Sequence, residues 1–122
     1  MTIKEFYEKI GGDYAQVEER LPSTELIEKF VVKFQSDGSY LQLCETMEKG
    51  QAEDAFRAAH TLKSVCGNLS FIRLYESASQ LTELLRNEMG EIPEEAFKIM
   101  EDVKKNYELV TDTVRKFIES AK

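Results

Sequence analysis

The sequence predicts an all-α protein: an antiparallel up-and-down four-helix bundle with short additional helices at its N-terminus. Apolar residues recur at spacings of three and four along almost the whole chain, glycines and prolines separate these stretches, and no stretch alternates as a strand does. A chain of 122 residues suits one domain with one core. We therefore expect a single domain over 1–122, with short helices in 1–21 and the bundle in 23–120.

Two short helices are expected first. Thr2 and Glu5 can form a capping box for a helix that ends at Gly11-Gly12, and Asp13 can cap a second helix that runs through residue 19.

A third helix opens at residues 22–25 and is broken or kinked at Asp37-Gly38. Ser39 with Gln42 offers a second capping box for a helix that continues to residue 50. The apolar positions at helical spacing in this part are Leu26, Ile27, Phe30, Val31, Phe34, Leu41, Leu43, Cys44 and Met47.

Three longer helices follow, expected over residues 52–68, over 71–89 with Gly90 ending it, and from Pro93 onward, where proline and two acidic residues suit a first turn. The last helix has an apolar seam made of Phe97, Met100, Val103, Tyr107, Val110, Val114 and Phe117.

The only histidine, His60, is expected on the outer face of the helix over 52–68. At about 100° per residue it projects opposite the apolar side, and Lys63, Ser64 and Gly67 share its face. Glycine within a helix costs about 1 kcal/mol relative to alanine, so Gly67 indicates close approach of another molecule, or else tight packing or an early helix end near Asn68. The apolar side consists of Ala55, Ala58, Ala59, Leu62, Val65, Cys66 and Leu69.

The residues around His60 form a specific run, His60-Thr61-Leu62-Lys63, followed by Gly67, Asn68-Leu69, Leu74 and Leu81. This run resembles the His-x-Leu/Ile-Lys-Gly pattern of the histidine-containing phosphotransfer (Hpt) domain of bacterial-type phosphorelays. The resemblance covers residues 23 to 120, and its specificity lies in about ten positions around His60.

Three positions depart from the family pattern. The family's glycine after the lysine is Ser64 here, and a later glycine is Ser70; both serines are small enough to keep clearance. The family often has a Gln or Glu on the next helix that hydrogen-bonds the other ring nitrogen of the histidine. The ungapped register places Thr82, a shorter side chain, at that position.

The resemblance implies that His60 accepts a phosphoryl group on Nε2 from a receiver-domain aspartate and passes it to another receiver. Lys63 would stabilise the phosphoryl oxygens, and Phe56, Ser64 and Gly67 would form the receiver-docking face. The implied protein is a monomeric phosphoryl carrier without autokinase activity and without a cofactor of its own. Mg²⁺ would be bound by the receiver, and a hybrid histidine kinase is a further expected partner.

Other possible functions of His60 have less support in the sequence. A metal site lacks a second histidine or a cysteine at ligand spacing, and a dyad with Ser64 lacks a nucleophile elbow. No GxxxxGK[ST] nucleotide loop is present. The alternative that remains open is an interaction module that docks receiver domains without carrying phosphate. Phe56, one turn before His60, could serve docking or pack under a neighbouring helix.

Composition excludes several partner classes. A net charge of −7 and an isoelectric point near 4.8 argue against nucleic acid and anionic membranes. No apolar run approaches the ~20 residues that span a bilayer, and the first residues lack the apolar core of a signal peptide. Cys44 and Cys66 occupy expected core positions rather than a disulfide framework. We expect a cytoplasmic protein.

Overall fold

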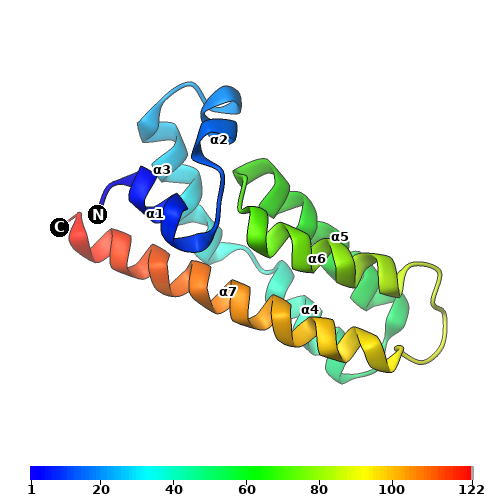
Figure 1. The fold of residues 1–122 in the computed structure, drawn as a ribbon. Helices are drawn as coiled ribbons and strands as arrows, with labels where there is room; N and C mark the ends of the chain where they lie inside the picture. The colour runs from blue at the N-terminus through cyan, green and yellow to red at the C-terminus, as the bar shows by residue number, and fades with distance from the viewer. Residues whose placement is uncertain (122) are drawn as a thin grey trace.

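The computed structural model describes residues 1–121 and confirms the all-α prediction, with no strand in that range (Figure 1). Seven α-helices and one 3₁₀ turn follow one another in this part of the chain. They are α1 (Ile3–Ile10), α2 (Tyr14–Arg20), α3 (Thr24–Lys33), η1 (Phe34–Ser36), α4 (Ser39–Glu48), α5 (Ala52–Leu69), α6 (Ile72–Leu85) and α7 (Glu94–Ser120).

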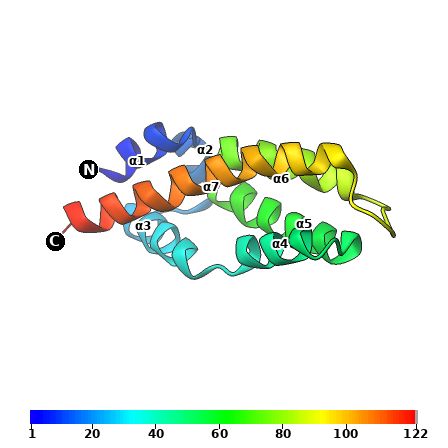
Figure 2. The same cartoon turned by 90° about the horizontal axis from the view of Figure 1, so that it is seen from below.

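The helix α7 runs the length of the molecule and organises the rest (Figures 1 and 2). At one end α5 packs between α4 and α6, and α6 also packs on α7. At the other end α1 and α3 pack on α7, and α2 contacts both of these short helices. The two termini lie at this second end, where the Met1 ammonium group donates a hydrogen bond to Ser120 Oγ at 3.2 Å.

Side-chain caps start the first three helices as the sequence predicts. The Thr2–Glu5 capping box forms, and Asp13 and Ser23 each accept a hydrogen bond from a backbone N–H of the first turn. The capping box expected from Ser39 and Gln42 is wrong. Ser39 is already the first residue of α4, and its backbone N–H and hydroxyl both donate to the Asp37 carboxylate.

The helix α6 is shorter than the sequence predicts, because it ends at Leu85 instead of Met89. Arg86 has an extended backbone with ψ 130°, and Asn87 has φ 64°, in the left-handed region that asparagine enters more readily than most residues. The chain then loops to Pro93, which precedes the first residue of α7.

The apolar face predicted for α5 is buried, apart from the half-buried Val65. The seam predicted for α7 is wrong at its beginning, where Phe97 is 45% exposed and Ala96 is buried. Where α1 meets the end of α5, Phe6, Tyr7 and Phe71 form a fully buried aromatic cluster with ring centroids 5.5–5.9 Å apart. This cluster joins the N-terminal helices to the bundle.

Candidate functional site

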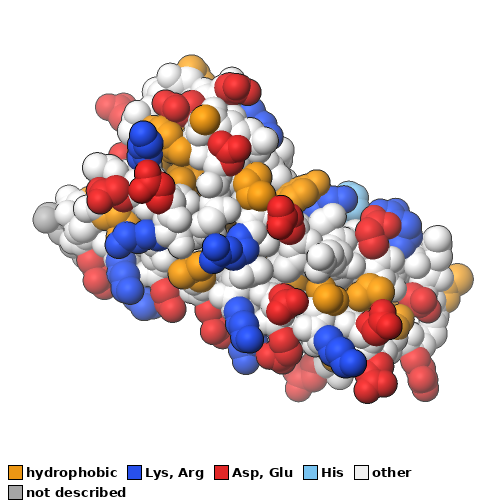
Figure 3. Space-filling model, in the orientation of Figure 1, with side chains coloured by type: hydrophobic (Ala, Val, Ile, Leu, Met, Phe, Trp, Pro, Cys, Tyr) orange, Lys and Arg blue, Asp and Glu red, His pale blue; other side chains and the backbone are white. Residues whose placement is uncertain are grey.

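His60 is exposed near the middle of α5, on the side opposite the buried alanines and leucines. Ala59 and Leu62, which precede and follow His60 in the sequence, are fully buried in the core. Their packing holds α5 in place, so the imidazole lies at the surface of a rigid helix. Figure 3 shows the chain's one histidine at the molecular surface, beside basic and hydrophobic side chains.

The aromatic ring of Phe56 links His60 to the end of α6. The ring centroids of Phe56 and His60 are 6.0 Å apart, and the guanidinium carbon of Arg86 lies 5.1 Å from the Phe56 centroid. Phe56 is half-buried here, so it both packs against α6 and contacts the imidazole. Sequence reasoning missed Arg86, because a helix continued to Met89 gives no reason for this side chain to turn toward α5.

Three charged side chains lie where α5 faces the end of α6: Lys63 on α5, Glu83 on α6 and Arg86 directly after α6. Arg86 donates two hydrogen bonds to the Glu83 carboxylate, at 3.0 and 3.3 Å. These bonds, the Arg86 charge and more weakly the Lys63 charge hold the pKa of Glu83 below its usual range. Lys63 is therefore close enough to sense Glu83, although no ion pair joins the two in residues 1–121. Of these three groups, Lys63 lies one turn from His60 on α5, whereas Arg86 and Glu83 lie at the end of α6 and are linked to the imidazole through the Phe56 ring.

Ser64 is exposed on the side of His60 away from α6. Its hydroxyl donates a hydrogen bond at 3.0 Å to the His60 backbone carbonyl, one turn earlier. Thr61 is also exposed, and its hydroxyl donates to the Arg57 carbonyl at 3.0 Å. Both hydroxyl protons are thus engaged by the helix backbone, which leaves this side of the imidazole small and uncovered.

Gly67 faces the aromatic ring of Tyr75. A Cβ atom at this position would lie 3.1 Å from Cε1 and 3.3 Å from Cδ1 of Tyr75, on α6. The Tyr75 ring therefore takes the space beside Gly67, which favours the packing alternative over clearance for a receiver.

Thr82, which the ungapped register with the family pattern places at the position of the residue that orients the histidine, points into the core. Its side chain is fully buried, and its hydroxyl donates a hydrogen bond at 2.7 Å to the Ala78 carbonyl. No hydrogen bond joins it to His60 in the part of the chain described. The structure therefore does not bring this predicted orienting residue to the imidazole.

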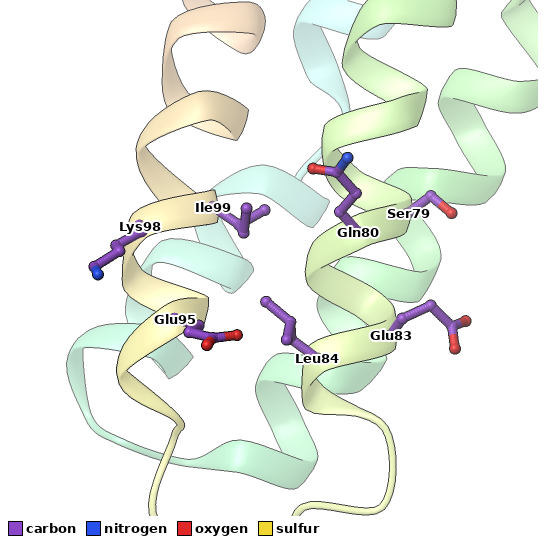
Figure 4. Close-up of a pocket in the computed structure, with 7 residues that line it drawn as sticks. All are labelled: Ser79, Gln80, Glu83, Leu84, Glu95, Lys98 and Ile99. Atoms are coloured by element: carbon purple, nitrogen blue, oxygen red, sulfur yellow. The ribbon is translucent and has the colours of Figure 1, made fainter.

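Several hollows flank α6, and two of them differ in their relation to His60. One, of about 320 Å³, lies between Phe56 and the loop after α6. The other is an open groove of about 760 Å³ between α6 and α7, in which Leu84 and Ile99 point toward each other while Ser79 and Glu83 project away from α7 (Figure 4). No residue of α5 lines the larger groove, and Glu83 is the residue that it shares with the charged cluster at the His60 site.

Within residues 1–121 the structure contains no group of three or more side chains that could hold a metal ion. No helix in the same range has the length and apolar character that crossing a membrane requires.

Comparison with known proteins agrees with this arrangement. The family model of the Hpt domain matches residues 25–116, which is most of the chain and includes α5 and α6 entirely. Neither the curated proteins nor the solved structures contain a significant match. Hpt domains are phosphocarriers that act with receiver domains and histidine kinases in phosphorelays. The chain belongs to the Hpt domain family.

Proposed function

We propose that this chain is a histidine phosphotransfer protein in which His60 accepts a phosphoryl group from a receiver-domain aspartate and passes it to a second receiver. The supporting observation is the position of His60, the only histidine, exposed on the rigid helix α5 beside cations and small side chains. The proposed docking face consists of the side chains around the imidazole and is called the His60 face below: Phe56, His60, Lys63, Ser64 and the edge at Gly67, which Tyr75 covers.

The transfer needs little chemistry from the carrier. The lone pair of neutral His60 Nε2 attacks the phosphorus, a P–N bond forms, and the P–O bond to the aspartate breaks to leave a carboxylate on the receiver. The proton on Nδ1 stays on the ring during this step. Because phosphoryl transfer has a loose transition state, in-line positioning and charge stabilisation provide most of the catalysis.

Two cationic side chains, Lys63 and Arg86, could stabilise the negative charge of the phosphoryl oxygens. Lys63 would act on the phosphoryl oxygens as a point charge, while the planar guanidinium of Arg86 can bind two oxygens at once. Arg86 is held by Glu83 in the free protein, and an arriving phosphoryl group would compete with that carboxylate for it. Glu83 would thereby keep the guanidinium near Phe56 until a phosphoryl group is present.

On this proposal the protein is a cytoplasmic monomer, and the receiver supplies the Mg²⁺ that the reaction uses. The acidic net charge of −7 is consistent with protein partners rather than nucleic acid. The sequence has no phosphate-binding nucleotide loop of the GxxxxGK[ST] type, so we propose a carrier that does not phosphorylate itself.

The test is transfer of radiolabelled phosphate from a phosphorylated receiver to the purified protein. We expect label that is lost in acid and stable in alkali, as a phosphorus–nitrogen bond to imidazole is. His60→Gln should abolish the labelling. Thr61→Ala, an exposed change at the next residue, should retain it.

Label that survives on His60→Gln would identify a Ser, Thr or Asp acceptor and overturn the mechanism. Receiver binding without any labelling of the unchanged protein would support the alternative, an interaction module that does not carry phosphate. Circular dichroism should show the same helicity for both variants, because exposed substitutions usually change stability by less than about 0.5 kcal/mol.

A further inference from the structure

The C-terminal end of α5 is covered by residues 1–21, a segment that lies outside the family match over 25–116. A helix leaves its last four carbonyl groups without partners inside the helix. In this protein, residues near the N-terminus of the chain donate hydrogen bonds to most of these carbonyl groups at the end of α5. The helix α5 is the one that carries His60.

Each carbonyl at this end has an identified donor. Arg20 Nη1 donates to the carbonyls of Gly67 at 2.5 Å and Asn68 at 3.1 Å, and the Tyr7 hydroxyl donates to the Leu69 carbonyl at 2.7 Å. The Asp13 backbone N–H donates to the next carbonyl, that of residue 70, at 2.9 Å. A positive charge at the negative end of the helix dipole adds to the effect of these bonds.

Ser70 gives a second, independent observation. It ends α5 with φ 58° and ψ 37°, a left-handed conformation that usually belongs to glycine at this place in a helix. The serine is fully buried, and its hydroxyl accepts a hydrogen bond from Arg20 at 3.1 Å and donates one to Gln16 at 2.7 Å. Two side chains of α2 therefore hold a residue in a conformation that its own backbone disfavours.

Close approach of the N-terminal segment depends on Gly12. A Cβ atom there would lie 2.9 Å from the Ser70 carbonyl oxygen and 2.7 Å from Cδ2 of Tyr7. Any larger residue at this position would force the segment away from α5.

We propose that residues 1–21 form a cap for α5 and that Arg20 is a positioning residue for phosphotransfer. By binding the Gly67 and Asn68 carbonyls, Arg20 holds the last turn of α5 helical, and with it the end of the His60 face where Gly67 packs against Tyr75. The positioning role of Arg20 in phosphotransfer rests on the proposed function, whereas the cap on α5 is independent of that function.

Hydrogen exchange of backbone amides tests the cap in the whole protein. In Arg20→Ala we expect the amides of Ser70 and Phe71, which bond to carbonyls of the last turn of α5, to exchange at least roughly tenfold faster. One lost hydrogen bond to a charged group accounts for about that factor, and Arg20 donates to three acceptors here. Central amides of α7 should be unchanged. Arg20→Lys, which keeps the charge, should lie between. Arg115→Ala, which removes an arginine paired only within α7, should leave Ser70 and Phe71 unchanged.

Gly12→Ala provides a second variant that leaves Arg20 in place, and it should accelerate the same two amides. Equal acceleration of all amides in both variants would indicate general destabilisation and overturn the assignment. Unchanged exchange at Ser70 and Phe71 would overturn it as well.

Transfer kinetics test the positioning role at a temperature where each variant is folded. For Arg20→Ala we expect the receiver concentration that gives half-maximal transfer to rise roughly threefold, with the maximal rate unchanged. Labelling of His60 by phosphoramidate, a small phosphoryl donor that needs no docking, should also be unchanged. Exchange that rises without any change in half-maximal concentration would overturn the positioning role.

Failure of the proposed function would look different, because a phosphorylated receiver would then not label the unchanged protein, while exchange of the Ser70 and Phe71 amides would still respond to Arg20→Ala.

Discussion

Replacement of Gly67 by alanine separates two explanations of a glycine inside the helix that carries His60. In solvent, this change would stabilise the helix by about 1 kcal/mol, because alanine has the higher helix propensity. In the structure the added methyl group would lie 3.1 and 3.3 Å from two ring atoms of Tyr75. Moving the ring off its rotamer costs about 0.5–1.5 kcal/mol, so the two effects should nearly cancel.

A double-mutant cycle measures this balance. Urea unfolding should give a change within about 0.5 kcal/mol for Gly67→Ala alone. In a Tyr75→Ala background the ring is gone, and the same substitution should stabilise the protein by the full propensity gain of about 1 kcal/mol. Tyr75→Phe is the matched control: it keeps the ring, so Gly67→Ala should again be nearly neutral.

A stabilisation of about 1 kcal/mol in all three backgrounds would refute the reasoning. It would mean that Tyr75 does not fill the space over Gly67, and that the glycine leaves clearance for a partner. In that case Gly67→Ala should also slow transfer from a phosphorylated receiver.

Three further predictions concern single side chains. Lys63→Ala should leave receiver binding intact and slow transfer roughly tenfold, as expected for the loss of one charge-assisted contact in the transition state. Transfer rates measured by stopped flow or rapid quench at a saturating receiver concentration check this. Arg86→Ala should slow transfer measurably in the same assay whereas Arg115→Ala should not, and equal rates would exclude a role for the Arg86 guanidinium. Burial raises the pKa of Tyr7 in the folded state, so the free energy of unfolding should fall as the pH rises above about 10, the unfolded-state value. Tyr7→Phe should reduce that dependence in unfolding measurements between pH 8 and 11 without abolishing it, because burial also raises the pKa of Tyr40, Tyr107 and Cys66. An unchanged slope would show that Tyr7 does not contribute.

The sequence predicts the helices and the exposure of His60 well, because both follow from local patterns. The caps at Thr2, Asp13 and Ser23 need only a short polar side chain and the backbone N–H groups two or three residues later. The outward direction of His60 follows from the 3.6-residue period of its apolar neighbours. Neither depends on which helix packs next to which.

The sequence-based predictions fail where the local structure depends on a segment distant in sequence or on the backbone angle of a single residue. Gly67 could be placed on a face by its spacing, but Tyr75 comes from the following helix. The end of α6 depends on Asn87, whose φ of 64° stops the helix without a glycine or a proline. An asparagine just after an apolar stripe is a known helix-end signal, so this end could have been found. The bonds from Arg20 to carbonyls 47 and 48 residues away have no local signal at all.

The surroundings of the imidazole are unequal on its two sides, and this bears on how a receiver reaches it. On the side toward α6, Phe56 contacts Arg86 and Gly67 contacts Tyr75, so this side is occupied by the protein itself. On the other side Ser64 is exposed, with its hydroxyl bonded back to its own helix. A receiver that phosphorylates His60 as proposed would therefore have most room over Ser64, while Phe56 and Lys63 would meet it on the side toward α6. On the proposed function, a serine at the family's glycine position would be compatible with transfer, because its hydroxyl proton is already bonded to the helix and it adds only a hydroxymethyl group to the surface that must be approached.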